Sequence, residues 1–251
     1  VIKTSVSLQA SSVNKNEALP LNLNYSKPFN ALLFNINYTY QSDYSNLFSP
    51  TLKIKYTTST SIPSVEQLRD QVTDTDPLFL TAGNSRLKQS YSHNFSANFL
   101  VNNPEISLDL KTSLISNSIV PRQRFFIEET VLPEFNNYIA PANSTLQTYD
   151  NLSGEVMSSF TTDYSTRISL IKSTLSISSD LKYNRKPSYI RDAVNITNRF
   201  SGLLKIGLSA NFPRAKLVLN SSSEYVKAVN TRRNDSEYFN QNIKFSYDYN
   251  I

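Results

Sequence analysis

The chain lacks the residues on which several classes of functional site depend. Its 251 residues include no cysteine, one histidine, one methionine and four glycines. Without cysteine there is no disulfide, no thiolate zinc site and no cysteine nucleophile. With a single histidine, His93, a transition-metal site would need carboxylates alone, which such metals rarely use. Because no apolar run approaches about 18 residues, a membrane-spanning helix is excluded.

Patterns typical of catalysis are missing from the sequence as well. It contains no recognisable nucleophile–base pair, phosphate-binding glycine loop or paired catalytic carboxylates. The net charge is +5 and the basic residues are scattered, which does not suit a nucleic-acid partner. We therefore expect a protein that is not an enzyme and that holds no cofactor and no metal.

Alternation of apolar and polar residues with period two is what the sequence has in abundance. In 243–251, Ile, Phe and Tyr at odd positions alternate with Lys, Ser, Asp and Asn at even positions. The stretches 204–212 and 106–114 alternate in the same way. A β-strand sends successive side chains to opposite faces, so each stretch predicts one apolar face and one polar face. Repeated along a chain at membrane-spanning length, this pattern is typical of an outer-membrane β-barrel.

Composition favours the same fold. Hydrophobic residues make up 39% of the chain, fewer than the about 45–50% usual for a packed soluble core. Aromatic residues nevertheless reach 12%, with 15 Tyr and 14 Phe. A barrel needs one apolar layer with aromatic girdles at both interfaces, which suits this composition. We predict an all-β, antiparallel transmembrane β-barrel in the bacterial outer membrane, in contact with its lipid and lipopolysaccharide.

The pattern predicts eleven strands, and this odd number also suggests that the barrel is partial. They are expected near residues 1–12, 20–27, 29–41, 51–60, 89–102, 105–118, 144–160, 165–184, 194–212, 214–229 and 237–251. Bacterial single-chain barrels have an even number of strands. We therefore expect 1–251 to be one segment of a larger barrel of about 22 strands, with the plug and both natural termini outside it. The first and last strands should each pair with a strand beyond this segment.

Connections between the expected strands differ in length. Short turns are predicted at 102–105, 161–164 and 211–214, and longer polar segments at 60–88, 119–143, 185–193 and 230–236. Because barrels of this kind have short periplasmic turns and long extracellular loops, the alternation predicts an orientation.

The phase of the pattern slips within 165–184, which predicts a β-bulge near Leu170–Ile171. Pro63, Val65, Leu68 and Val72 predict one or two helical turns in 60–88.

The segment 52–101 carries a set of motifs in a defined order. They are Tyr56, Pro63-Ser64, Gln67-Leu68, Asp76-Pro77-Leu78, Gly83-Asn84, Leu87-Lys88 and Ser92-His93-Asn94. In this order and spacing the segment resembles the β-barrel of TonB-dependent outer-membrane receptors of Bacteroidota. Ser85 and Gln89-Ser90 depart from the Pro and Pro-Glu of that family. The resemblance implies barrel architecture, with TonB and a surface lipoprotein or other outer-membrane subunits as partners, and it identifies no substrate-binding residue.

A few residues are candidates for ligand or partner contact. Arg122, Arg124, Phe125 and Phe126 combine cations with aromatic rings on a long loop, where they could meet a ligand, a partner or lipopolysaccharide phosphates. His93 shares its parity with neighbouring aromatic residues and is expected to face outward in a girdle. The cluster Asp70, Asp74 and Asp76 does not have the spacing of a calcium-binding loop, and a solvated loop is expected there.

Charged residues on the expected polar face predict a wet or plugged lumen with a basic bias. They include Lys53, Lys55, Asp109, Lys111, Glu155, Lys172, Asp180, Lys182, Lys205, Lys216, Lys244 and Asp248. Three functions are open at this point. The first is TonB-dependent uptake of a bulky nutrient through a plugged barrel. The second is a structural or docking barrel subunit that does not transport, and the third is a secreted β-rich adhesin.

Overall fold

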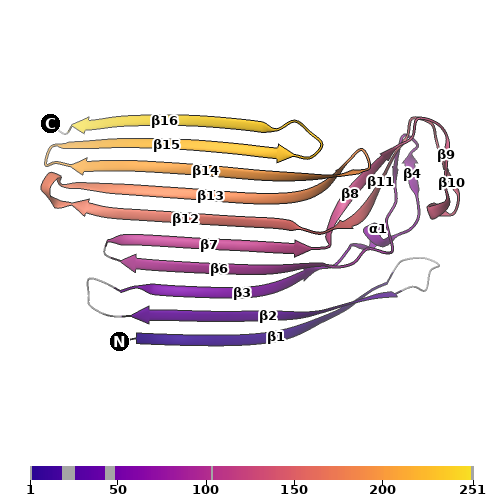
Figure 1. The fold of residues 1–251 in the computed structure, drawn as a ribbon, viewed down its shortest axis with the longest axis horizontal. Helices are drawn as coiled ribbons and strands as arrows, with labels where there is room; N and C mark the ends of the chain where they lie inside the picture. The colour runs from indigo at the N-terminus through magenta and orange to yellow at the C-terminus, as the bar shows by residue number, and fades with distance from the viewer. Residues whose placement is uncertain (1, 19–25, 43–48, 103, 250–251) are drawn as a thin grey trace.

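The fold is one large antiparallel sheet with a small module at one end (Figure 1). The computed structural model describes residues 2–18, 26–42, 49–102 and 104–249. In spatial order the ten strands of the main sheet are β1 (Ile2–Ala18), β2 (Ser26–Ser42), β3 (Thr51–Ser61), β6 (Ser90–Asn102), β7 (Glu105–Ser116), β12 (Glu155–Ile168), β13 (Ser173–Ile190), β14 (Ala193–Asn211), β15 (Ala215–Asn230) and β16 (Ser236–Tyr249). No helix of the described residues is long and apolar enough to cross a membrane.

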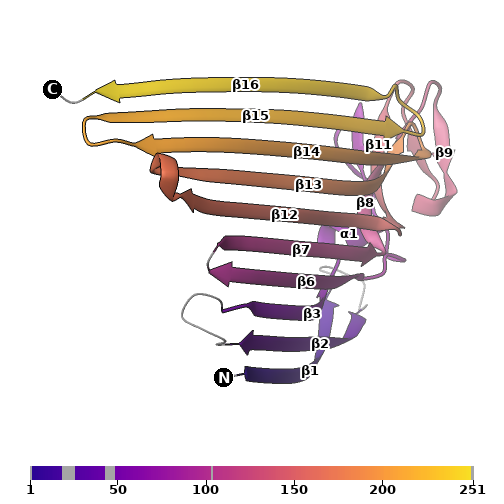
Figure 2. The same ribbon diagram turned by 60° about the vertical axis from the view of Figure 1, so that its left-hand side comes forward.

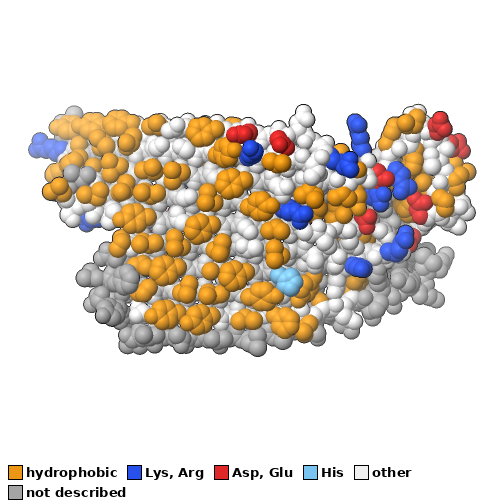
Figure 3. Space-filling model, viewed as in Figure 1, with side chains coloured by type: hydrophobic (Ala, Val, Ile, Leu, Met, Phe, Trp, Pro, Cys, Tyr) orange, Lys and Arg blue, Asp and Glu red, His pale blue; other side chains and the backbone are white. Residues whose placement is uncertain are grey.

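The two faces of the main sheet differ in polarity, as the alternation predicts. Phe245, Leu219, Leu208 and Leu175 lie side by side in one row across β16, β15, β14 and β13. Directly paired residues share a face, so the rows of one parity form an apolar face and the intervening rows a polar face. Figure 3 shows hydrophobic side chains covering the apolar face along the length of the strands. The register places the following apolar residues on this one face: Leu108, Leu110, Ile206, Leu208, Leu217, Leu219, Phe245 and Tyr247.

The sheet is open in this structure. β1 pairs only with β2 and β16 only with β15 among the described residues, so these two strands are its edges. The strands are also offset, and both views show β14–β16 reaching farther from the module than β1–β3 (Figures 1 and 2). Such an offset is what strands tilted in a barrel wall display. The all-β antiparallel expectation is therefore confirmed.

Ten strands rather than eleven form the sheet. The expected strand 29–41 lies within the longer β2, and most of 20–27 falls outside the described residues. The predicted turn at 161–164 is wrong, because β12 continues through these residues in unbroken register with β7 and β13. The turn lies at Ser169–Ile171, a 3-10 helix followed by Lys172 in the left-handed region (φ 46°). The expected bulge near Leu170–Ile171 is therefore a hairpin turn, and the phase slip marks the change of strand.

Connection lengths differ between the two ends of the sheet. The end that carries Ser169–Ile171 and the turn between β14 and β15 has short connections, where the Phe212 amide donates to the Ala215 carbonyl at 2.8 Å. The opposite end carries the long segments 62–89 and 117–154, which include the predicted loops 60–88 and 119–143 almost entirely (Figure 1). The expected strand 144–160 is wrong, because Thr145–Leu152 pair with Ser118–Phe125 outside the main sheet, which the chain re-enters only at Glu155. The expected loop 185–193 is an exception. Most of it is strand, and β13 joins β14 through the two residues Arg191 and Asp192.

The two long segments fold together into what we call the loop module. It contains α1 (Val65–Leu68), β4 (Thr73–Asp76), β5 (Phe79–Thr81), β8 (Ser118–Phe125), β9 (Thr130–Leu132), the 3-10 helix η1 (Pro133–Phe135), β10 (Tyr138–Ala140) and β11 (Thr145–Leu152). β4, β5, β11 and β8 form a four-stranded sheet, and β9 pairs with β10. One apolar cluster joins them and consists of Leu80, Ala82, Phe126, Leu132, Ala140 and Leu146. The module therefore has a core of its own.

The predicted helical turn is confirmed as α1. Ser64 caps it, accepting from the Gln67 amide at 3.3 Å, while Gln67 Oε1 accepts from the Ser64 amide at 2.9 Å. This reciprocal pair is a capping box. Leu68 is buried together with Leu87 and Phe29, which anchors the helix to the end of the main sheet.

Candidate functional site

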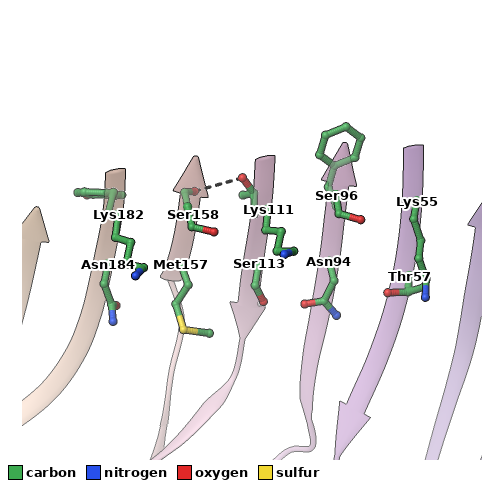
Figure 4. Close-up of a pocket in the computed structure, with 14 residues that line it drawn as sticks. Lys55, Thr57, Asn94, Ser96, Lys111, Ser113, Met157, Ser158, Lys182 and Asn184 are labelled. Carbon is green, nitrogen blue, oxygen red and sulfur yellow. Dashed lines mark hydrogen bonds between the residues drawn. The ribbon is translucent and has the colours of Figure 1, made fainter. Parts of the chain in front are cut away.

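One row of the polar face alternates lysine with serine. The register places five residues side by side across β3, β6, β7, β12 and β13: Lys55, Ser96, Lys111, Ser159 and Lys182. Neighbouring strands lie about 4.8 Å apart, so successive lysines are separated by roughly 10 Å. The row lines a cavity of about 490 Å³, and Figure 4 shows its polar side chains arranged on five adjacent strands.

Two of these lysines are paired with carboxylates on their own strands. Lys111 Nζ lies 2.6 Å from Asp109 Oδ2, and Lys182 Nζ lies 2.5 Å from Asp180 Oδ2. Both lysine side chains are more than half exposed, so each pair contributes only about 0–1 kcal/mol. The pairs neutralise most of the charge in the row. This row is therefore a hydrogen-bonding surface of mixed charge.

The four predicted contact residues of the loop do not form one site. Arg122 and Arg124 point to one side of β8, with Arg124 Nη1 2.8 Å from Glu134 Oε1. Phe126 follows them with the same parity and is buried in the module core. Phe125 lies on the opposite side of the strand and is 60% exposed. The structure thus joins the two arginines in a polar network and assigns Phe126 to packing.

Arg122 is the centre of that network. Its Nε donates to Asp192 Oδ1 in the turn between β13 and β14, and its Nη1 lies 3.5 Å from Asp150 Oδ2. The hydroxyl of Tyr189 donates to the same carboxylate at 3.0 Å, and the guanidinium stands 5.3 Å from the centre of the Tyr189 ring. These contacts fasten β8 and β11 of the loop module to the end of the main sheet.

The network shifts the ionisation of its members. The hydrogen bond from Arg122 is the main reason that the pKa of Asp192 lies below its ordinary value of 3.8. The same bond raises the pKa of Arg122. The pKa of Glu134 is also lowered, first by a hydrogen bond to its own backbone amide and then by Arg124. All three groups are therefore charged at neutral pH, and the network is ionic.

A second cavity, of about 250 Å³, opens beside the arginines. Its polar lining consists of Asp70, Asn84, Arg86, Arg122, Arg124, Glu134, Thr148, Asp150 and Asp192. Opposite charges are nearly balanced in this set. Most of its carboxylates already have protein partners, since Asp70 accepts from the Ser85 amide at 2.6 Å and Glu134 pairs with Arg124. We infer that this cavity is mainly a structural joint.

The three aspartates of 70–76 serve separate purposes. Asp76 Oδ1 accepts from the Leu78 amide at 2.9 Å within a turn. Asp74 Oδ2 accepts from the Tyr138 hydroxyl at 3.3 Å, which ties β4 to β10. With Asp70 bound to the Ser85 amide, each carboxylate has its own local partner.

His93 lies on the apolar face, as its parity predicts. Its Nδ1 is 2.8 Å from the Tyr56 hydroxyl, and its ring meets the Tyr91 ring edge-on at a centroid distance of 4.9 Å. In Figure 3 the single histidine appears among hydrophobic side chains toward the loop-module end of the strands. The outward-facing position is therefore confirmed, and a place in a girdle at the membrane interface stays a prediction.

Sequence reasoning missed the partners of the two arginines. Asp150, Tyr189 and Asp192 lie 28 to 70 residues from Arg122 in the chain, and no motif connects them. Only the pairing of β8 with β11, and the turn between β13 and β14, brings them together. Only knowledge of which strands pair, and in which register, could have shown that these residues lie close to Arg122.

Comparison with known proteins supports the fold. The model of a family described as "Outer membrane protein beta-barrel family" matches residues 33–250, which is most of the chain. No curated protein and no solved structure matches it significantly. The matched residues include the main sheet from within β2 to β16 and the whole loop module, and they leave out β1.

Proposed function

Because the chain belongs to the outer membrane protein beta-barrel family, we propose that it forms part of the wall of a barrel that imports a bulky nutrient in a TonB-dependent manner. Its location is the bacterial outer membrane, where the apolar face of the main sheet meets lipid. The proposal includes no enzymatic step. Its further partners are TonB and lipopolysaccharide.

The observation that carries this proposal is the contrast between the two faces of the sheet. The polar face holds the lysine–serine row and its cavity of about 490 Å³, whereas the opposite face is apolar along the strands. A barrel built from such a wall encloses a polar interior. The paired charges, amides and hydroxyls of this row suit contact with water, with a plug or with a polar solute.

Growth on scarce nutrients tests the proposal. A strain without the full-length gene should grow poorly on one class of nutrient too large to diffuse through porins, and removal of TonB should reproduce the defect. The wild-type gene should restore growth. A gene with Lys182→Glu, which places a second carboxylate beside Asp180 in the polar wall, should restore it less well than one with Arg214→Glu at the short-turn end. Equal growth of the deletion strain on every nutrient would refute an import role.

A docking role is the second candidate, and the loop module supplies the observation that favours it. Several large apolar side chains of the module are exposed outside the main sheet: Leu78, Phe79, Phe125, Ile127, Val131 and Ile139. Exposed apolar residues of this kind often mark protein contacts. A surface lipoprotein or another outer-membrane subunit would be the partner. Recovery of a stoichiometric partner with the full-length protein, without any nutrient phenotype, would favour docking over import. Family membership gives no support to a secreted adhesin.

A further inference from the structure

A third cavity, separate from the two described above, lies between the loop module and two hairpins of the main sheet. Its volume is about 430 Å³, and it is lined by Pro121, Gln123, Gln147, Tyr189, Ile190, Arg191 and Arg233. Gln123 and Gln147 face it from β8 and β11, while the two arginines come from the turns after β13 and β15. The lining contains two cations and no carboxylate.

Arg191 and Arg233 have no carboxylate partner among the described residues. Neither guanidinium forms an ion pair with a residue in the described part of the chain. The acidic residues next to them in sequence are already engaged. Asp192 binds Arg122, and Asp235 Oδ1 accepts from the Asn230 amide at 2.9 Å. The cavity is therefore a place of positive potential with amide groups beside it.

Arg191 occupies a backbone position that does not favour arginine, so its presence there needs an explanation. Ile190 pairs with Ala193, so Arg191 and Asp192 alone form the hairpin loop, with φ of 47° and 65°. Hairpin loops of two residues with positive φ favour Asn-Gly or Asp-Gly, because an ordinary side chain is strained there. The ion pair with Arg122 accounts for Asp192. Among the described residues no ion pair or side-chain hydrogen bond accounts for Arg191, which instead lines the cavity.

We propose that this cavity binds a phosphate group, with Arg191 and Arg233 donating to its oxygens. A planar carboxylate is satisfied by one guanidinium fork, whereas a tetrahedral phosphate accepts from two guanidinium groups that approach from different hairpins. Gln123 Nε2 donates to Gln147 Oε1 at 3.2 Å, so the amide pair forms a neutral wall beside the anion. The site lies at the long-connection end of the barrel wall and goes beyond the import role. The phosphate could belong to a lipid headgroup or to a soluble anion.

Binding by the full-length protein in detergent tests this site. The probes are lipopolysaccharide from the host, the same lipid with its phosphates removed, and inorganic pyrophosphate. The variants are Arg191→Asn, which suits a left-handed turn, and Arg233→Gln; Arg214→Gln at the opposite end of the sheet is the control. Thermal unfolding should show that Arg191→Asn is at least as stable as the wild type, which separates lost binding from lost folding.

We expect each site variant to weaken binding about tenfold while the control binds as the wild type does. If the site variants bind intact lipopolysaccharide more weakly than the wild type does, but bind the dephosphorylated lipid as the wild type does, the ligand is a lipid phosphate. Loss of pyrophosphate binding, without an effect on the lipid, identifies a soluble anion. Wild-type affinity of both site variants for all probes, or no phosphate-dependent binding by the wild type, would overturn the proposal.

Discussion

At the scale of single residues, the Gly83-Asn84 motif is explained by the close approach of its backbone to the backbone of α1 and Arg69. Gly83 donates its amide to the Arg69 carbonyl at 2.8 Å, and the Asn84 amide donates to the Gln67 carbonyl at 2.6 Å. The Asn84 side chain also donates to the Tyr149 carbonyl on β11 at 3.0 Å. The Gly-Asn pair therefore joins α1 to the sheet of the loop module. Its role is architectural, in agreement with what the resemblance of 52–101 implies.

Substitution of Gly83 by alanine should destabilise the loop module. A Cβ at this position would lie 2.5 Å from the Arg69 nitrogen and 2.6 Å from the Glu66 carbonyl oxygen, and neither backbone atom can move easily. We expect a cost of roughly 1–3 kcal/mol, seen as faster proteolysis within 62–89. Gly202→Ala is the matched control, because its Cβ would meet only the side chains of Leu181 and Phe200, at 3.3 and 3.9 Å. Equal protease resistance of the two variants would show that the contact at Gly83 is unimportant.

At the scale of elements, the sequence predicts strands more reliably than the points where they turn. Alternation located most strands of the main sheet, because one face is apolar along nearly every strand. It failed at 161–164, where polar Thr and Asp residues look like a turn but lie in a continuous ladder. The turn at Ser169–Ile171 was mistaken for a bulge, because Lys172 rather than glycine takes the left-handed conformation. A period-two pattern cannot distinguish a polar strand segment from a turn, or recognise a turn that contains no glycine.

The candidate site could be predicted only in part for a related reason. Arg122 and Arg124 were recognisable by their type and position in a long loop, and they do lie in a polar network. Phe126 could not be distinguished from Phe125, because strand parity in β8 decides which ring is buried. The arginines of the third cavity come from separate hairpins, so only the assembled strands bring them together.

The network between β8 and the turn after β13 should make stability depend on pH. Because the pKa of Asp192 is lowered in the folded state, its stabilising effect is present above 3.8, near its unfolded value, and is lost as pH falls below that value. Asp192→Asn keeps a residue that tolerates positive φ but removes the charge. The thermal midpoint of the full-length wild type should exceed that of this variant at neutral pH, and the difference should shrink toward pH 3.

Asp163→Asn is the control for this experiment. Asp163 is exposed on the polar face and has no ion-pair partner in the ranges that the structure describes. Its substitution should leave the pH profile of the thermal midpoint unchanged. A difference between wild type and Asp192→Asn that stayed constant from neutral pH to pH 3 would contradict the ionic role of Asp192.

At the scale of the whole molecule, the main sheet is a membrane wall with an apolar and a polar side. Its strands have 11 to 19 residues, and about 9–11 are needed to cross the hydrocarbon core, so all are long enough and the longer ones extend beyond it. The edges β1 and β16 need strand partners in lipid, where unpaired backbone groups are costly. The long connections and the loop module lie together at one end. We predict that this end faces the outside of the cell, because outer-membrane barrels have long extracellular loops and short periplasmic turns.

The central claim is that the apolar face contacts lipid, and paired arginine substitutions test it most directly. Leu208 lies on that face beside Leu175 and Leu219, whereas its neighbour Ser209 lies on the polar face. An arginine near the bilayer midplane costs about 2–4 kcal/mol on a lipid-facing position and little on a lumen-facing one. The measurement is the free energy of unfolding of the full-length protein in lipid vesicles. We predict that Leu208→Arg lowers it by about 2–4 kcal/mol and Ser209→Arg by less than about 1 kcal/mol; equal effects would contradict the account.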